Sequence, residues 1–214
     1  MVGHFNLRID NADVRAYEGS SILEAALSNK IYIPHICNDP ELKPFGGCRL
    51  CIVKVEGMKG MPAACTTLAA PGMNVVTRDA ELDAVRKDTL ELLLSTHPDD
   101  CLSCTANIKC ELQDTIARVG GITRKLRRMD LKPFAENITP FFVYDPKYCI
   151  LCQKCVRACD EVARQDFLTV VNRGSESQVA CFIGEKELRE VCPTCMQCVK
   201  HCPTAALRQV APET

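Results

Sequence analysis

Two runs of four cysteines with identical spacing constrain this chain more than any other feature. CILCQKCVRAC begins at Cys149 and CPTCMQCVKHC begins at Cys192, and both read C-x2-C-x2-C-x3-C. An offset of 43 residues, from Cys149 to Cys192, superposes all four cysteines and also places Val156 on Val199. The last third of the chain therefore contains an internal repeat that is organised around metal-ligand spacing rather than around a hydrophobic face.

The spacing within each run fits a cubane iron–sulfur cluster better than a zinc ion. Three thiolates separated by two residues wrap one face of a [4Fe-4S] cluster, and the fourth ligates the neighbouring cluster, as in two-cluster bacterial ferredoxins. A zinc tetrahedron takes four ligands in two pairs, so two cysteines of each run would be surplus. We therefore predict two [4Fe-4S] clusters: one on Cys149, Cys152, Cys155 and Cys202, and one on Cys192, Cys195, Cys198 and Cys159.

The density of cysteines raises the question of compartment. Sixteen cysteines in 214 residues occur in secreted disulfide proteins and also in metal carriers. The N-terminal residues show no basic start followed by an apolar run, so no secretory signal is predicted. No apolar stretch approaches the ~20 residues that a bilayer crossing needs. We therefore expect a cytoplasmic protein without a membrane span, whose thiols bind metal.

The charge of the chain does not point to nucleic acid. The net charge is −1, and the one strongly basic run is RKLRR, residues 124–128. Such a run is expected to be a solvated face, with a docking patch for an acidic partner or a phosphate contact as alternatives. Because Trp is absent and 5% of residues are aromatic, a base-stacking platform is not expected. We therefore expect no nucleic-acid partner.

Residues 1–78 are predicted to form a β-grasp domain. Residues 5–17 alternate between apolar and polar side chains and can turn at Asp10 and Asn11, as in a β-hairpin. Ser21 and Glu24 form a capping box for a short helix over SILEAALS, and LCIVKVEG is typical of a further strand. A hairpin, a helix and another strand favour the scaffold of [2Fe-2S] ferredoxins.

A second cysteine set lies on this scaffold. Gly46 and Gly47 precede Cys48 in a loop that must fold closely around a metal site. The gaps between the cysteines differ from the plant-type ferredoxin spacing, so the scaffold decides the interpretation. A [2Fe-2S] cluster fits, and a structural zinc site remains the alternative. The candidate ligands are Cys37, Cys48, Cys51 and Cys65.

A third set lies in HPDDCLSCTANIKC, which begins at His97. The preceding residues predict a helix with Asp79 as N-cap, and Pro98 should end that helix close to His97. A further helix is predicted from Cys110 to Gly120 within a helical domain over residues 79–130. His97 could end the first helix or complete a [4Fe-4S] site. The helix stripe is predicted to contain Leu82, Val85, Leu92 and Leu93, and the candidate site contains His97, Cys101, Cys104 and Cys110.

Several segments together resemble the iron–sulfur electron-transfer subunits of NAD(P)-linked hydrogenases. They are IYIPHIC, GGCRLCIVKVEG, LELLLSTHPDDCLSCTANIKCELQ and CILCQKCVRACDEVA, with the second cysteine run. These subunits are similar to the N-terminal region of the large iron–sulfur subunit of respiratory complex I. Related segments occur in NAD-dependent formate dehydrogenases and [FeFe] hydrogenases. The resemblance covers residues 4–208 and implies an α+β fold with one [2Fe-2S] cluster and three [4Fe-4S] clusters, one of them with His97 as a ligand.

The resemblance also implies a function and partners. The chain would pass electrons between a flavin- and NAD(P)H-binding iron–sulfur subunit and the small and large subunits of a hydrogenase. The alternative catalytic partner is a molybdenum- or tungsten-dependent formate dehydrogenase subunit, and a soluble ferredoxin takes part in complexes that split electrons. No phosphate-binding glycine motif occurs among the eleven glycines. We therefore expect a non-catalytic subunit, with a zinc-stabilised scaffold and a nucleic-acid-binding iron–sulfur protein as competing classes.

Two departures from the family pattern matter. Cys181, in QVACFIG, matches no ligand position and is expected to be a buried structural thiol. Several relatives continue into a larger domain, whereas this sequence ends at Thr214, so we expect the catalytic centre on another polypeptide, as in [NiFe]-hydrogenase assemblies. FLTVVNRGSESQVACFIG is predicted as a hairpin inserted in a ferredoxin domain over residues 140–214, and KPFAENITP is predicted as a linker.

Overall fold

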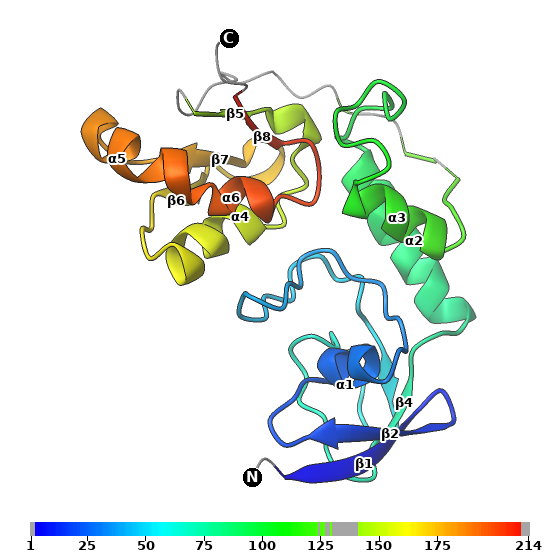
Figure 1. Cartoon of the computed structure of the whole chain (residues 1–214). Coiled ribbons are helices and arrows are strands. Elements are labelled where there is room, and N and C mark those ends of the chain that lie inside the picture. The colour runs from blue at the N-terminus through cyan, green and yellow to red at the C-terminus, as the bar shows by residue number, and fades with distance from the viewer. Residues whose placement is uncertain (1–2, 124, 127–128, 130–140, 211–214) are drawn as a thin grey trace. The chain divides into compact units, whose positions relative to one another are not determined.

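The computed structural model describes residues 3–123, 125–126, 129 and 141–210 (Figure 1). Its contacts divide the chain into two compact units, and helices α2 and α3 contribute residues to both. The first unit comprises Met1–Asn38, Pro44–Leu90 and Thr115–Ile122, and the second comprises Asp39–Lys43, Glu91–Asp114 and Thr123–Thr214. The predicted division into three domains stays a prediction.

Two sequence predictions fall at least partly on residues that the structure does not describe. The predicted linker KPFAENITP lies entirely outside the described residues, and so do three arginines of the basic run RKLRR, namely Arg124, Arg127 and Arg128. Within the described ranges, no helix combines the length and the apolar character that crossing a bilayer would require.

A four-stranded mixed sheet forms the base of the first unit. Its order is β2-β1-β4-β3, with β1 parallel to β4 and the outer pairs antiparallel. Asp10 and Asn11 join β1 to β2 with φ of 51° and 66°, the left-handed conformations of a two-residue hairpin turn, so the predicted hairpin is confirmed. The strand predicted over LCIVKVEG is shorter than expected. The strands are β1 His4–Ile9, β2 Ala12–Tyr17, β3 Lys54–Val55 and β4 Asn74–Val76.

Helix α1, Ile22–Ser28, begins with the predicted capping box. The Ser21 hydroxyl accepts a hydrogen bond from the Glu24 N–H at 3.1 Å, and the Glu24 carboxylate accepts one from the Ser21 N–H at 2.7 Å. The buried face of α1 packs in one apolar core with the inner side chains of β1 and β2. Cys51 and Cys65 belong to the same core, so the sheet and α1 position two of the candidate ligands.

Helix α2, Ala80–Leu94, starts where predicted, and the Asp79 carboxylate caps the Leu82 N–H at 2.8 Å. Its predicted apolar stripe is wrong in part, since Val85 is 39% and Leu92 62% exposed. The buried side chains instead recur mainly every four residues and include two charged ones: Leu82, Arg86, Leu90, Glu91 and Leu94. Helix α3, Glu111–Arg118, ends before Gly120 and Gly121, both with positive φ, as the sequence predicts.

The second unit contains two small antiparallel pairs. Strands β6 and β7 form the predicted inserted hairpin, with Leu168 opposite Cys181. Strands β5 and β8, which were not predicted, pair the beginning of the 141–210 segment with its end. The strands are β5 Phe142–Tyr144, β6 Leu168–Val171, β7 Gln178–Cys181 and β8 Leu207–Gln209. The short single turns are η1 Pro146–Tyr148, η2 Ala158–Val162 and η3 Gly174–Glu176.

The sequence repeat is also a backbone repeat. Helix α4, Lys154–Arg157, and helix α6, Gln197–Lys200, are separated by the same offset of 43 residues as the cysteine runs. Each follows a non-glycine residue in the left-handed conformation, Gln153 with φ 58° and Met196 with φ 48°. The longer helix α5, Glu185–Cys195, precedes α6 and carries Cys192 and Cys195. The two runs therefore bend the chain in the same way before their third cysteine.

Candidate metal centres

The structure brings together the sulfurs of Cys37, Cys48, Cys51 and Cys65 in the first unit. A hydrogen bond from the Cys37 thiol lowers the pKa of Cys48 to about 5, and the same contact raises the pKa of Cys37. Likewise, the bond between Cys51 and Cys65 raises the pKa of Cys51 and lowers that of Cys65. The charges of Cys37 and Cys48 also act on Cys65, so the two pairs are neighbours. Four thiols at one place can share two irons.

Backbone N–H groups of the loop point at these sulfurs. Cys48 N–H donates to Cys37 Sγ at 3.4 Å, and a further N–H at Gly47 opposes the rise in the pKa of Cys37, while one at Gly46 helps to lower the pKa of Cys65. Gly46 has φ of 70°, and a Cβ there would lie 3.2 Å from Thr66 Cγ2. The glycine lets the loop turn tightly enough to present these donors, which stabilise the negative sulfurs of a bound cluster.

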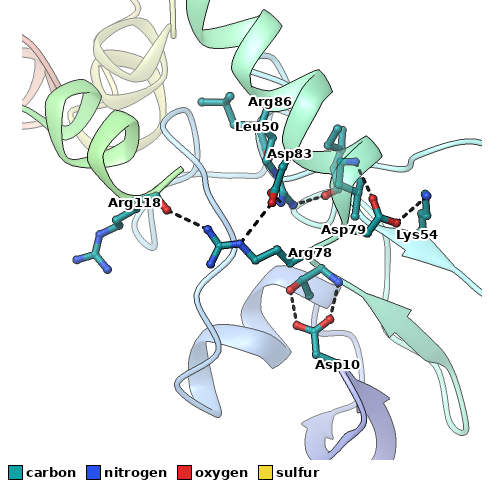
Figure 2. Close-up of polar contacts among 11 residues, drawn as sticks. Asp10, Leu50, Lys54, Arg78, Asp79, Asp83, Arg86 and Arg118 are labelled. Carbon is teal, nitrogen blue, oxygen red and sulfur yellow. Dashed lines mark hydrogen bonds and ion pairs between the residues drawn. The ribbon is translucent and has the colours of Figure 1, made fainter. Parts of the chain in front are cut away.

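Arg86 supports the same loop from helix α2. Its side chain is 1% exposed and donates to Leu50 O at 3.1 Å and to Ile52 O at 2.7 Å, the carbonyls on either side of Cys51. It also pairs with Asp83 at 3.2 Å (Figure 2). Burial lowers the pKa of Arg86, and the charges of Asp83 and Cys51 act against that shift. Sequence analysis missed this residue, although an arginine four positions from two core leucines is a signal.

Three thiols of the His97 set lie close together in the second unit. Burial raises the pKa of Cys110, and the charges of Cys104 and then Cys101 add to that rise. Cys101 is exposed, and the other two are partly buried. Helix α3 begins one residue after its predicted start, so Cys110 directly precedes it, and Cys101 and Cys104 lie in the loop before it.

His97 is buried and its ring is held in place. Its Nδ1 lies 3.0 Å from Pro98 O, and its ring meets the Tyr148 ring edge-on at 5.8 Å. The hydrogen bond to Asp100 and burial raise the pKa of Tyr148 to about 12, and the charge of Cys104 adds to this rise, so the tyrosine that contacts His97 also lies near one of the three thiols. A proton on Nδ1 would be donated to the Pro98 carbonyl, and Nε2 would then present its lone pair to iron, as in most histidine metal ligands. Helix α2 ends before His97, at Leu94.

The first cysteine run meets the last cysteine of the second run. Burial raises the pKa values of Cys149, Cys152 and Cys155, that of Cys152 to about 12, and the charge of Cys202 contributes to each of these rises. All four cysteines line one cavity. The Tyr144 hydroxyl donates to the Cys149 sulfur, which opposes the rise in the pKa of Cys149, and Leu151 N–H donates to the same sulfur at 3.4 Å. Tyr144 is a contributor that sequence analysis missed.

We expect a Tyr144→Phe variant to lower the reduction potential of a cluster at Cys149 by about 40 mV. A hydroxyl bond to a ligand sulfur favours the reduced, more negative state by about 1 kcal/mol, which is about 40 mV for one electron. Redox titration followed by electron paramagnetic resonance measures this shift. The control is Tyr148→Phe, whose hydroxyl bonds to Asp100 at 2.6 Å instead. An unchanged potential in Tyr144→Phe would contradict the role.

The second cysteine run meets Cys159 of the first. Burial raises the pKa of Cys198 to about 12, and the charges of Cys159, Cys192 and Cys195 contribute to that rise. Phe167 N–H donates to Cys159 Sγ at 3.3 Å. These four cysteines line a second cavity together with Cys181. Cys181, which we expected to be a buried structural thiol, is thus a half-buried part of this wall.

The donor sets fit iron–sulfur clusters. Each of the four groups gathers thiols of three or four cysteines, and backbone N–H groups donate to a sulfur in all four groups. Cluster sulfurs and ligating thiolates carry negative charge and accept such bonds.

Comparisons with known proteins identify two iron–sulfur binding regions in the chain. Residues 4–80 match the family of the 2Fe-2S iron-sulfur cluster binding domain, and residues 86–123 match the NADH-ubiquinone oxidoreductase-G iron-sulfur binding region. The first range contains the Cys37 set, and the second contains His97 with its three cysteines.

Among relatives, the chain is 35% identical over 201 residues to an NADH-quinone oxidoreductase subunit of Rhizobium meliloti, covering 93% of the chain and 23% of that protein. It is 35% identical over 206 residues to the NADP-reducing hydrogenase subunit HndD of Solidesulfovibrio fructosivorans, covering 94% and 35%. The chain thus spans about a quarter to a third of the length of these curated relatives.

A solved structure matches over nearly the whole chain. It is a chain of an NAD+-reducing [NiFe]-hydrogenase in the H2-reduced state, 30% identical, with a TM-score of 0.86. The match covers 97% of this chain and 88% of the hydrogenase chain, so the fold as a whole is shared.

Proposed function

The chain belongs to the iron–sulfur electron-transfer subunits of NAD(P)-linked hydrogenases and complex I-like oxidoreductases, and from this premise we propose that it relays electrons through four clusters. The proposed [2Fe-2S] ligands are Cys37, Cys48, Cys51 and Cys65. The proposed [4Fe-4S] ligands are His97, Cys101, Cys104 and Cys110, then Cys149, Cys152, Cys155 and Cys202, and finally Cys192, Cys195, Cys198 and Cys159. The proximity of Cys202 to the first run carries this assignment.

The chain's own residues hold and tune the sites. Bound clusters supply one-electron chemistry. Loop N–H groups at Cys48, Leu151 and Phe167 bind ligand sulfurs, and Arg86 fixes the loop at Cys51. Most of the cysteines are buried or half-buried, which limits water at the sulfurs. The chain thereby prepares sites with different ligand sets and surroundings, which is how a relay obtains different potentials.

The partners that this role requires are a flavin- and NAD(P)H-binding subunit and a separate catalytic subunit. The match to a hydrogenase chain of known structure, at 30% identity and a TM-score of 0.86, supports a hydrogenase as the catalytic partner. A complex that splits electrons would use a soluble ferredoxin as a further partner. With any of these partners, the proposed role of the chain is to conduct electrons, and it contributes no catalytic residue.

Anaerobic purification of the native assembly tests the proposal. The co-eluting chains are identified, and iron, acid-labile sulfide, nickel, molybdenum, tungsten and zinc are measured. The expected result is that nickel co-elutes with iron in a constant ratio and that a flavin-binding chain is present in the same fractions. Molybdenum or tungsten without nickel would replace the hydrogenase by a formate-type partner, and zinc in place of iron would overturn the relay itself. Reduction of added ferredoxin together with NAD(P) would identify electron splitting.

A further inference from the structure

A fifth thiol lines the cavity of the second cysteine run. The cavity is lined by Cys181 in addition to the four proposed ligands of that cluster, Cys159, Cys192, Cys195 and Cys198. The cavity of the first run contains four cysteines among the described residues, and all four are proposed ligands. The two halves of the repeat therefore differ by one additional thiol.

The inserted hairpin carries Cys181 to this cavity. Cys181 on β7 lies opposite Leu168 on β6, and Phe182 N–H next to it donates to Phe167 O at 2.9 Å. The N–H of the same Phe167 donates to Cys159 Sγ at 3.3 Å. Two hydrogen bonds through Phe167, one to a backbone carbonyl and one to a sulfur, thus connect the end of strand β7 to the proposed ligand Cys159.

The side chain of Cys181 points toward the ligands. Directly opposed residues of an antiparallel pair share one face, as do alternate residues of a strand. Leu168 and Val179, which share the face of Cys181, are each 3% exposed and pack in the core cluster that contains Cys159. Phe182, on the other face, is 66% exposed. Cys181 packs against the same cluster.

Cys192 and Cys159 line the cavity together with Cys181 and interact with it electrostatically. Burial raises the pKa of Cys192, and the charge of Cys181 adds to that rise. Cys192 shares the cavity wall with Cys181 and is the ligand that Cys181 can replace.

We propose that Cys181 is a reserve ligand for the cluster on Cys159, Cys192, Cys195 and Cys198, and that its sulfur binds the iron left open when Cys192 is lost. This inference rests on the proposed cluster ligation. The Cys181 S–H bond breaks, its proton leaves to solvent, and a sulfur–iron bond forms. No electron is transferred, and the cluster again has four thiolates.

The internal repeat provides a matched control. Cys149 is the counterpart of Cys192 at the offset of 43 residues, and its cavity has no additional cysteine among the described residues. The full chain is prepared anaerobically with its clusters as the native protein, Cys149→Ala, Cys192→Ala, Cys181→Ala, and the pair Cys192→Ala with Cys181→Ala. Iron and sulfide per chain are measured, and the reduced clusters are examined by electron paramagnetic resonance.

We expect Cys149→Ala to lose about four irons relative to the native chain, or about one on conversion to a three-iron cluster. Cys192→Ala and Cys181→Ala should each keep the native iron content, and the pair should lose as much as Cys149→Ala. Cys192→Val, which also lacks a donor atom, replaces Cys192→Ala in the single and paired variants if the alanine variant does not fold. Equal losses of iron in Cys149→Ala and Cys192→Ala would overturn the proposal that Cys181 is a reserve ligand. A native chain without iron would instead overturn the proposed function.

Discussion

Replacing Cys202 by alanine is expected to remove the cluster of the first cysteine run, although Cys202 belongs to the second. Its sulfur charge acts on Cys149, Cys152 and Cys155, and it lines the cavity of that run. Its thiol donates to Thr204 O at 3.3 Å, and the Thr204 hydroxyl in turn donates to Tyr148 O at 2.7 Å. A missing thiolate leaves one iron open, so we expect loss of about four irons or conversion to a three-iron cluster.

Iron analysis and electron paramagnetic resonance of the reduced chain distinguish the two clusters. Cys202→Ala and Cys149→Ala should lose the same signal, whereas Cys198→Ala should lose the other one. Cys198 is the matched control because it lies in the same run as Cys202 but lines the second cavity. Loss of the same signal in Cys202→Ala and Cys198→Ala would show that each run binds its own cluster. It would refute the assignment of Cys202 to the cluster of the first run.

An Arg86→Met variant is expected to lower the free energy of unfolding of the first unit by about 3 kcal/mol. Methionine keeps most of the apolar volume but leaves the carbonyls of Leu50 and Ile52 without their buried donor. Each unsatisfied buried group costs about 1–3 kcal/mol. Since these carbonyls flank Cys51, we also expect the [2Fe-2S] absorption to bleach at a lower denaturant concentration.

Arg78→Met is the matched control for this experiment. Arg78 also pairs with Asp83, at 3.6 Å, and also donates to a backbone carbonyl, but its side chain is 65% exposed (Figure 2). Exposed pairs contribute about 0–1 kcal/mol, so the control should unfold close to the native midpoint. Equal midpoints for Arg86→Met and Arg78→Met would contradict the structural role of Arg86.

The features that sequence analysis predicted depend on residues close together in the chain. The capping box spans Ser21 to Glu24, and the hairpin turn needs only Asp10 and Asn11 in left-handed conformations. The cysteine runs are also local, because a cluster fixes the spacing of its ligands. Such patterns could be interpreted without a structure.

The features that sequence analysis missed depend on distant residues. Arg86 binds carbonyls 34 and 36 positions away, which makes a charged side chain favourable in a helix stripe that would otherwise be apolar. Tyr144 reaches the Cys149 sulfur only because β5 pairs with β8 at the far end of the segment. Cys181 shows no ligand spacing, and the register of β6 and β7 is what brings it to the cavity wall.

The backbone repeat has a consequence for how this part of the chain could have arisen. With the proposed ligands, Cys159 of the first half serves the second cluster, and Cys202 of the second half serves the first. Cutting the chain in the β6–β7 hairpin would leave each fragment with three ligands for its own cluster, so neither half is a self-sufficient module. Reciprocal donation of this kind is the contact pattern of a two-fold symmetric dimer. With the proposed ligands, the two halves therefore have the symmetry of a homodimer whose subunits are joined into one polypeptide.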